Sequence, residues 1–179
     1  MAEVYIDPSP ANFQSFKDLP RDTPINMLNL LLYRETAEYP EGHEHAGKGW
    51  SGRRAYEEYG KTSGPIFQRV GGSILWRGRF ETMVTGPEVR EWHDGFIAHY
   101  PNAGAFFAMI KDPEYQLAVV NRTAALVDSR LVRFAPGEVG DVIVDSYTLE
   151  CAFKETTIDG NRVRLRAYND QVPGPLITT

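Results

Sequence analysis

At 179 residues, the chain has the length of one domain that buries a core without disulfides, with room for an appendage. Its hydrophobic share of 42% and charged share of 24% are typical of a globular protein, and no apolar run approaches the roughly 20 residues of a membrane span. A net charge of −5, with arginines dispersed among acids, argues against a nucleic-acid partner. The start shows no signal peptide and Cys151 is the single cysteine, so we expect a cytoplasmic protein.

The first predicted elements are a short helix and a buried strand. Residues 9–20 space Phe13 and Phe16 at a helical interval after Ser9, a candidate N-cap, and we expect this helix to lie across the domain as a lid or brace. Residues 25–33 form a nearly continuous apolar run, which is typical of a strand covered on both faces.

A long loop and a second helix follow. Residues 34–50 are polar, contain glycine and have no hydrophobic period, which indicates a loop, and loops of this length tend to be functional or mobile. Ser51 is the candidate cap of a helix that we expect Gly64-Pro65 to kink or interrupt and Gly71-Gly72 to end.

Two strands and two helices come next. Residues 73–84 and 89–100 are rich in strand-forming residues and flank a Gly-Pro turn, so we expect an antiparallel pair. Residues 102–110 predict a short helix, Asp112 caps another helix that starts with proline, and residues 128–134 predict a closing strand.

The resulting order β-α-β-β-α-β predicts an α+β, ferredoxin-like domain over residues 1–134, with two helices on one face of a four-stranded sheet. The other face would expose a large apolar patch, so we expect a homodimer. Residues 135–179 form a predicted extension, in which a strand over 142–153 pairs with one over 161–168 and an arm follows.

Six short motifs carry a family resemblance. They are MLNLLLY (27–33), Tyr56-x-x-Tyr59, GGSILWRG (71–78), Tyr100-Pro101, DPEYQ (112–116) and RTAALVDSRL (122–131). Together and in this order they resemble the DUF1330 family, a branch of the dimeric α+β barrel proteins, over residues 22–134. The resemblance implies a ferredoxin-like protomer whose sheet packs against its twin. It implies no settled reaction, because the wider superfamily includes monooxygenases, isomerases, dehydratases, polyketide cyclases and heme-handling proteins.

Arg122 lies near the centre of the apolar stripe of the helix that follows Asp112. The small residues Ala118 and Ala125 leave it room on that stripe. A guanidinium is costly to bury without a partner. One interpretation is structural: the guanidinium caps carbonyls at a helix end or forms an ion pair with a carboxylate, for which the candidates are Asp94, Glu57, Glu58 and Asp128. The other is an anion clamp for a substrate carboxylate or enolate, with Tyr115 one helical repeat away as a second donor.

Histidines supply further candidates. His93, next to Trp92 and Asp94, is a candidate general base near neutral pH, and its alternative is a solvated or hydrogen-bonded structural histidine. His43 and His45 form a weak His-x-His signal without a third ligand, so we predict no metal site.

A pocket hypothesis joins the polar residues of the predicted sheet. Asn29 and Tyr33 share one face of the first strand, while Leu28, Leu30 and Leu32 share the other. Because Trp76 and Arg79 point to opposite faces, at most one of them joins Asn29, Tyr33, His93 and Arg122 in a cavity. The alternative is that these residues are satisfied core polar groups.

Two functions follow from that pocket. The first is a cofactor-independent enzyme that acts by proton transfer, as an isomerase, lyase or cyclase, on a small anionic or carbonyl compound. Arg122 would hold the anion, His93 would move the proton, and Asn29 or Tyr33 would orient the carbonyl; a cofactor-free monooxygenase needs the same pocket. The second is a non-catalytic ligand-binding or assembly module.

Overall fold

The computed structural model describes residues 4–87, 91–137, 152–158 and 161–167. The chain divides into two units, Met1–Pro136 and Gly137–Thr179. The elements of the first unit are α1 (Pro10–Asp18), β1 (Ile25–Tyr33), α2 (Gly52–Arg69), β2 (Ser73–Arg79), β3 (Asp94–Tyr100), α3 (Ala103–Lys111), α4 (Pro113–Ala125) and β4 (Leu126–Phe134).

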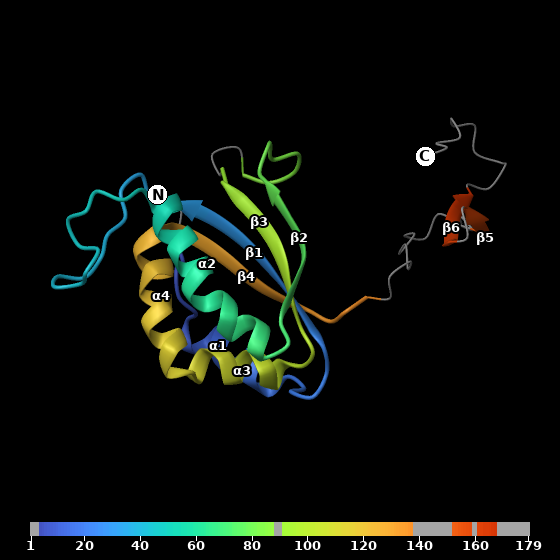
Figure 1. Ribbon diagram of the computed structural model, residues 1–179, viewed down its shortest axis with the longest axis horizontal. Coiled ribbons are helices and arrows are strands. Elements are labelled where there is room, and N and C mark those ends of the chain that lie inside the picture. The colour runs from blue at the N-terminus through green and yellow to red at the C-terminus, as the bar shows by residue number, and fades with distance from the viewer. Residues whose placement is uncertain (1–3, 88–90, 138–151, 159–160, 168–179) are drawn as a thin grey trace. The chain divides into compact units, whose positions relative to one another are not determined.

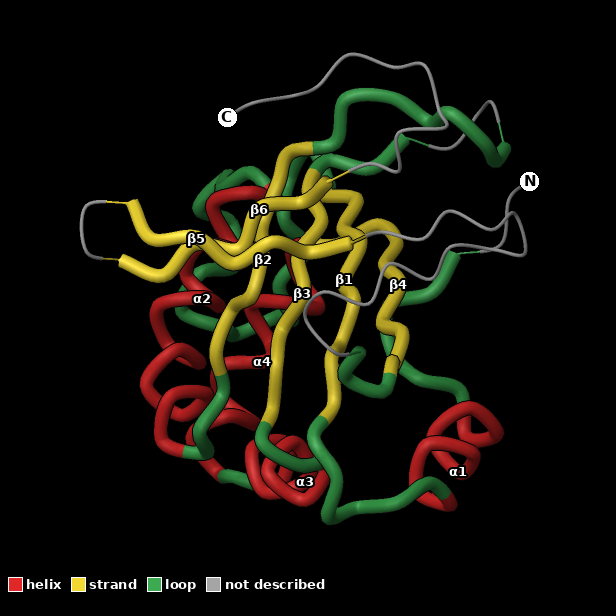
Figure 2. Tube along the Cα trace, turned by 90° about the vertical axis from the view of Figure 1, so that its right-hand side faces the viewer, coloured by secondary structure: helices red, strands yellow, loops and turns green. Residues whose placement is uncertain are grey.

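The first unit is a two-layer α+β structure with the predicted ferredoxin-like topology. Its sheet has the order β2-β3-β1-β4, and every neighbouring pair is antiparallel (Figure 2). The long helices α2 and α4 lie side by side on one face of the sheet, while α1 and α3 lie near one end (Figure 1). The two β-α-β crossovers therefore put both long helices on the same side.

Side-chain caps begin the helices where the sequence indicates. Hydroxyl oxygens of Ser9 and Ser51 accept hydrogen bonds from backbone N–H groups at the starts of α1 and α2, and Asn102 and Asp112 do the same for α3 and α4. The expected interruption at Gly64-Pro65 is wrong, because α2 runs through it to Arg69. The next residue, Ile66, is buried in the core, and this packing outweighs the backbone hydrogen bond that Pro65 cannot donate.

Strands β2 and β3 are shorter than predicted and β2 contains a bulge. β2 ends at Arg79 rather than at residue 84, and β3 begins at Asp94 rather than at residue 89; residues 88–90 lie outside the described part. Between Ile74 and Trp76 the register shifts by one residue. Trp76 therefore pairs with Ile97, and the next residue, Arg77, pairs with Phe96 on the side of the helices.

The core lies between the helices and the sheet face that they cover. Its strand residues come from the odd positions of β1, which are buried or line the cavity, and from alternate positions of β3. On the outer face, away from the helices, the apolar side chains are half-buried or exposed. They are Leu28, Leu30, Leu32, Trp76, Ile97, Val132 and Phe134. Within the described ranges, no helix is both long and apolar enough to cross a membrane.

Helix α4 passes into β4 without a linker, because Ala125 ends the helix and Leu126 begins the strand. β4 thus starts two residues earlier than the predicted 128–134.

Residues 34–50, which were predicted to form a long loop, contain turns and bends but no helix or strand, as expected.

The second unit contains a two-stranded antiparallel sheet of β5 (Ala152–Ile158) and β6 (Asn161–Ala167). The predicted C-terminal hairpin is therefore present, with β6 where it was expected. Its first strand lies later than the predicted 142–153, since the strand-forming run Thr156 to Ile158 extends it to the Asp-Gly dipeptide. Residues 142–151, with Cys151, and the arm from 168 lie outside the described residues.

Candidate ligand-binding cavity

A cavity of about 1440 Å³ lies between the helices and the face of the sheet that they cover. Its apolar lining includes Phe13, Met27, Phe67, Phe96, Ala98, Phe106, Met109, Ile110, Val119 and Leu131. Its polar lining includes Asn29, Tyr33, Arg53, Tyr56, Glu57, Tyr59, Arg77, Asp94, Tyr100, Tyr115 and Arg122. The volume exceeds the roughly 300–1000 Å³ of an ordinary ligand pocket, so there is room for a compound of several rings.

The lining changes from polar to apolar along the strands. Tyr33 and Asp94 lie near the carboxyl end of β1, where Asp94 pairs with Leu31. Towards the amino end of β1, Met27 pairs with Ala98, and the side chains from α3 that follow are apolar. One end of the cavity therefore suits charged or hydrogen-bonding groups, and the other suits hydrocarbon.

A tyrosine, a carboxylate and an arginine form a linked group at the polar end. The Tyr33 hydroxyl donates to Oδ2 of Asp94 at 2.7 Å, and Nη1 of Arg53 donates to the same oxygen at 2.8 Å. The Arg53 guanidinium also lies 4.9 Å from the centre of the Tyr33 ring. Burial, followed by the hydrogen bond and charge of Asp94, raises the pKa of Tyr33, so its hydroxyl stays protonated at neutral pH.

Tyr56 lies between the charged groups of the cavity. Its ring packs 5.4 Å from that of Tyr33 and 5.3 Å from that of Tyr59. Burial raises the pKa of Tyr56, and the positive charges of Arg122 and Arg77 oppose that rise. Its hydroxyl makes no hydrogen bond to any residue that the structure describes, and its oxygen is not among the fully buried polar atoms although the residue as a whole is only 6% exposed. A hydroxyl on a cavity wall without a protein partner is suited to donate to water or to a ligand.

Tyr115 and Tyr59 contribute a second pair of hydroxyls, whose oxygens are 3.1 Å apart. Burial, then the charge and hydrogen bond of Tyr59, raise the pKa of Tyr115. Both side chains line the cavity, as does Arg122, which lies two turns along α4 from Tyr115. Tyr115 and Arg122 therefore share one wall, as the helical spacing predicts.

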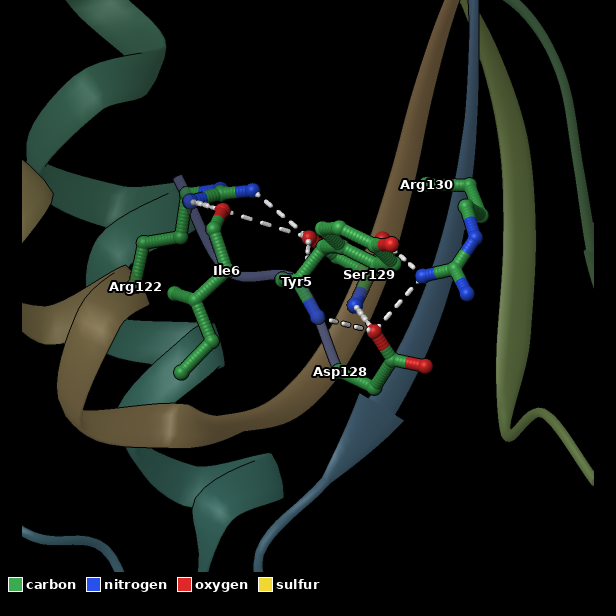
Figure 3. A network of polar contacts seen from close by, with 6 residues as sticks. All are labelled: Tyr5, Ile6, Arg122, Asp128, Ser129 and Arg130. Carbon is green, nitrogen blue, oxygen red and sulfur yellow. Dashed lines mark hydrogen bonds and ion pairs between the residues drawn. The ribbon is translucent and has the colours of Figure 1, made fainter. Parts of the chain in front are cut away.

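The partners of Arg122 come from the N-terminal segment and from β4 (Figure 3). Its Nη1 donates to the carbonyl oxygen of Ile6 at 3.0 Å and lies 3.6 Å from a carboxylate oxygen of Asp7, and its Nη2 donates to the Ser129 hydroxyl at 3.1 Å. The guanidinium thus has protein partners, as the structural interpretation expects, but the carbonyl that it binds lies before α1 and not at a helix end. None of the four carboxylates proposed from the sequence forms the ion pair.

Asp128 holds the same N-terminal segment from β4. Its carboxylate is fully buried and accepts hydrogen bonds from the backbone N–H of Tyr5 at 2.7 Å and from Nη1 of Arg130 at 2.6 Å. The N–H of Ser129 in turn donates to the carbonyl of Tyr5 at 2.6 Å (Figure 3). Asp7, Pro8 and the start of α1, which follow this anchor, form part of the cavity wall.

The structure brings together four of the residues predicted for the site. Asn29, Tyr33, Tyr115 and Arg122 all line the cavity, and Nδ2 of Asn29 donates to the carbonyl of Met27 at 2.9 Å. A cavity therefore adjoins Arg122, although its guanidinium also has protein partners.

Among the described residues, the cavity lining does not include His93, Trp76 or Arg79. His93 is exposed just before β3, where its Nδ1 accepts a hydrogen bond from the backbone N–H of Tyr33 at 2.9 Å. Trp76 lies on the outer face, close to Gly95. The cavity instead gains Arg77, which was not among the predicted site residues and which the bulge in β2 sets opposite Phe96.

The two histidines of the 34–50 loop belong to an aromatic cluster. The His43 ring stacks on Tyr39 at 4.7 Å, and the His45 ring lies 4.2 Å from that of Trp50. In the described part of the chain, no three His, Cys, Asp or Glu side chains gather in a way that could hold a metal ion.

Comparisons with known proteins relate the chain to one protein family and to several solved structures. The model of the DUF1330 family, described as a domain of unknown function, matches residues 51–134. A crystal structure of the methylated RPA0582 protein is 44% identical, with 76% of this chain and 98% of that chain covered and a TM-score of 0.70. A structure of the RPA0582 protein of unknown function from Rhodopseudomonas palustris is 43% identical, with 76% and 99% covered and a TM-score of 0.69. No curated protein matches.

A more distant structure comes from Bacteroides fragilis and is described as a dimeric protein of unknown function with a ferredoxin-like fold. It is 10% identical, with 63% of this chain and 96% of that chain covered and a TM-score of 0.38.

Proposed function

Because this chain belongs to the DUF1330 family, whose domain has no assigned activity, we propose its function from the cavity: the protein binds a small organic compound that carries a carbonyl or carboxyl oxygen. The observation that carries this proposal is the Tyr56 hydroxyl, whose residue lines the cavity and which has no hydrogen-bond partner among the described residues. Since its pKa is raised by burial, the hydroxyl is a hydrogen-bond donor and not a base at neutral pH.

The surrounding side chains support the same class of ligand. Arg77 and Arg122 bring positive charge to the neighbourhood of Tyr56, which favours an oxygen with partial or full negative charge. The apolar lining favours a hydrocarbon body, because burying that surface stabilises the complex by roughly 25 cal/mol per Å².

We expect Tyr56→Phe to weaken the binding of a carbonyl probe about three- to tenfold, the loss of one neutral hydrogen bond. The probe is prodan, a dimethylaminonaphthyl ketone whose fluorescence responds to an apolar environment and to hydrogen bonding at its carbonyl. Titration of the full chain gives the Kd, and the emission of the bound dye should shift to shorter wavelength in the variant.

The matched control for this titration is Tyr39→Phe. The substitution removes the same hydroxyl group. The Tyr39 hydroxyl donates to Asn121 at 2.8 Å, and Tyr39 lies in the 34–50 loop and does not line the cavity. Prodan should bind this variant like the wild type. Equal affinity and equal emission for Tyr56→Phe and the wild type would contradict the proposal, as would a chain that does not bind the dye.

Proton transfer is the second candidate function, and the hydrogen bond between Tyr33 and Asp94 favours it. Both side chains line the cavity, so on ligand binding the Tyr33 hydroxyl would turn its one proton from Asp94 to the bound carbonyl oxygen, and the freed Asp94 carboxylate would accept a proton from the adjacent carbon, leaving an enolate. In this proposal Tyr33 has the role that the sequence suggested, and Asp94 replaces His93 as the base. The acid and the base both come from the protein.

Asp94→Asn is expected to reduce proton exchange at the carbon next to the prodan carbonyl by at least about 100-fold, since it removes a general base. Deuterium uptake in D₂O, followed by mass spectrometry, measures that exchange. Glu57→Gln is the control, because Glu57 is another carboxyl on the lining, 3.6 Å from Arg54 and more exposed. Exchange that is no faster with the wild-type protein than in buffer would eliminate this candidate and leave the binding proposal intact.

We also propose that the partner of the outer face is a second copy of the chain. The apolar side chains of that face come from all four strands of the sheet and lie on one side of it. A two-fold axis would set this surface against itself, so that leucines of β1 meet apolar residues of the other copy. The cavity lies on the opposite side of the sheet and would stay accessible in such a dimer.

A further inference from the structure

Arg77 reaches the cavity because of the bulge in β2. The register shift between Ile74 and Trp76 pairs Arg77 with Phe96, which in turn pairs with Asn29, and these three residues cross the helix-facing side of the sheet in one row. The Arg77 guanidinium lies 5.1 Å from the centre of the Phe96 ring. Its positive charge lowers the pKa of both Tyr33 and Tyr56 against the larger effect of their burial. The charge is therefore directed at the polar half of the cavity.

The other two arginines of the lining are engaged by the protein. Arg53 donates to the carboxylate of Asp94, and Arg122 donates to the carbonyl of Ile6 and the hydroxyl of Ser129. For Arg77, by contrast, no carboxylate lies within 4.0 Å among the residues that the structure describes. Within the described ranges, Arg77 is thus the lining arginine without a hydrogen-bonded or ion-paired side chain, and a guanidinium matches a carboxylate in a two-point contact.

The lining beyond Arg77 indicates the shape of that ligand. Towards the amino end of β1, the row after Asn29 contains Met27 and Ala98, and α3 contributes Phe106 and Met109 beyond it. Two residues along a strand span about 7 Å, so an apolar body of one or two rings fits between the Arg77 row and α3. The cavity therefore has a cationic end and a hydrocarbon end.

We propose that Arg77 anchors the carboxylate of an amphipathic organic acid whose apolar body extends towards α3. This inference rests on the proposed function, since the acid occupies the same cavity and meets the Tyr56 hydroxyl there. It narrows the ligand from carbonyl compounds in general to carboxylic acids with an aromatic or aliphatic body. It also assigns the anion contact to Arg77, whereas the sequence pointed to Arg122.

The test compares two probes that share one ring system, prodan and the corresponding dimethylaminonaphthalene carboxylate, in titrations of the full chain. Arg77→Gln should weaken binding of the carboxylate about three- to fivefold, a range suited to a partly exposed ion pair, and leave the Kd of prodan unchanged. Added salt should weaken carboxylate binding to the wild type and have little effect on the variant, because the ion pair is screened.

Arg79→Gln is the matched control, since Arg79 lies two residues along the same strand and is exposed but does not line the cavity. It removes the same charge and should bind both probes like the wild type. Equal losses in Arg77→Gln and Arg79→Gln would show a general effect of net charge and overturn the assignment. So would a variant that binds both probes unchanged, or one that loses prodan as much as the carboxylate. If neither probe binds the wild type, the proposed function itself fails, and the two failures are thus distinguishable.

Discussion

Replacing Gly52 with alanine is expected to lower the free energy of unfolding by about 3 kcal/mol, the upper end of the usual range for overpacking. A Cβ at this position would lie 2.5 Å from the carbonyl oxygen of Arg34 and 2.7 Å from its nitrogen, and closer still to the carbonyl oxygen of Ala125. All three atoms belong to the backbone, so no side chain can rotate away.

Gly52 has no room because three elements meet at that point. The N–H of Arg34, just after β1, donates to the carbonyl of Ala125 at 2.8 Å, and the N–H of Gly52 donates to the carbonyl of Arg34 at 3.1 Å. These bonds join the end of β1, the start of α2 and the junction of α4 with β4. An added methyl group would have to separate them, and the wall of the cavity would shift with α2 and α4.

Gly60→Ala on the same helix provides the control. A Cβ there would meet nothing within 4 Å, so the higher helix propensity of alanine should stabilise the fold by up to about 1 kcal/mol. Urea unfolding followed by circular dichroism measures both variants. If Gly52→Ala unfolds at the same urea concentration as Gly60→Ala, the close backbone approach at Gly52 is wrong.

Val132→Lys is expected to dissociate the proposed homodimer, with a Kd at least about 100-fold higher than that of the wild type. Val132 pairs with Leu28 across the outer face and is 40% exposed in a single copy. In a two-fold dimer each substitution occurs twice, so two ammonium groups would be buried without partners. Sedimentation velocity over a range of protein concentrations measures the equilibrium.

Leu117→Lys tests whether any new surface charge has this effect. Leu117 lies on α4 and is 76% exposed, so its replacement should leave the dimer intact. A wild-type chain that sediments as a monomer at all concentrations would contradict the homodimer and point to another cover for the outer face. A dimer that tolerates Val132→Lys would move the interface to a different surface.

Local signals explain which parts of the fold were predictable from the sequence. β1 has the predicted bounds, because an apolar run bordered by polar residues leaves one choice for a buried strand. The capping residues Ser9, Ser51, Asn102 and Asp112 mark helix starts through bonds to residues two or three positions away. Such short-range chemistry is visible in a single sequence.

The composition of the site depended on contacts that are not local. The carbonyl partner of Arg122 is 116 residues away in the chain, and no pattern at either position indicates the other. His93 was expected within a strand, but β3 starts one residue later and its ring serves the backbone of Tyr33. The bulge that sets Arg77 opposite Phe96 depends on the pairing of β2 with β3, and the sequence of β2 alone does not indicate it.

That bulge has a consequence for how the protein can vary. Beyond Leu75, the assignment of each β2 side chain to the ligand or to the outer surface depends on whether the bulge forms as well as on residue identity. If the same residues paired without a bulge, Trp76 would lie opposite Phe96, so the indole would turn inward and the guanidinium outward. Deleting Leu75, the extra residue, would instead leave Trp76 opposite Ile97 and Arg77 opposite Phe96 in a regular ladder. A relative that lacks this one residue would therefore keep the same pocket side chains, and alignments of this strand need a gap at Leu75 before its residues are compared.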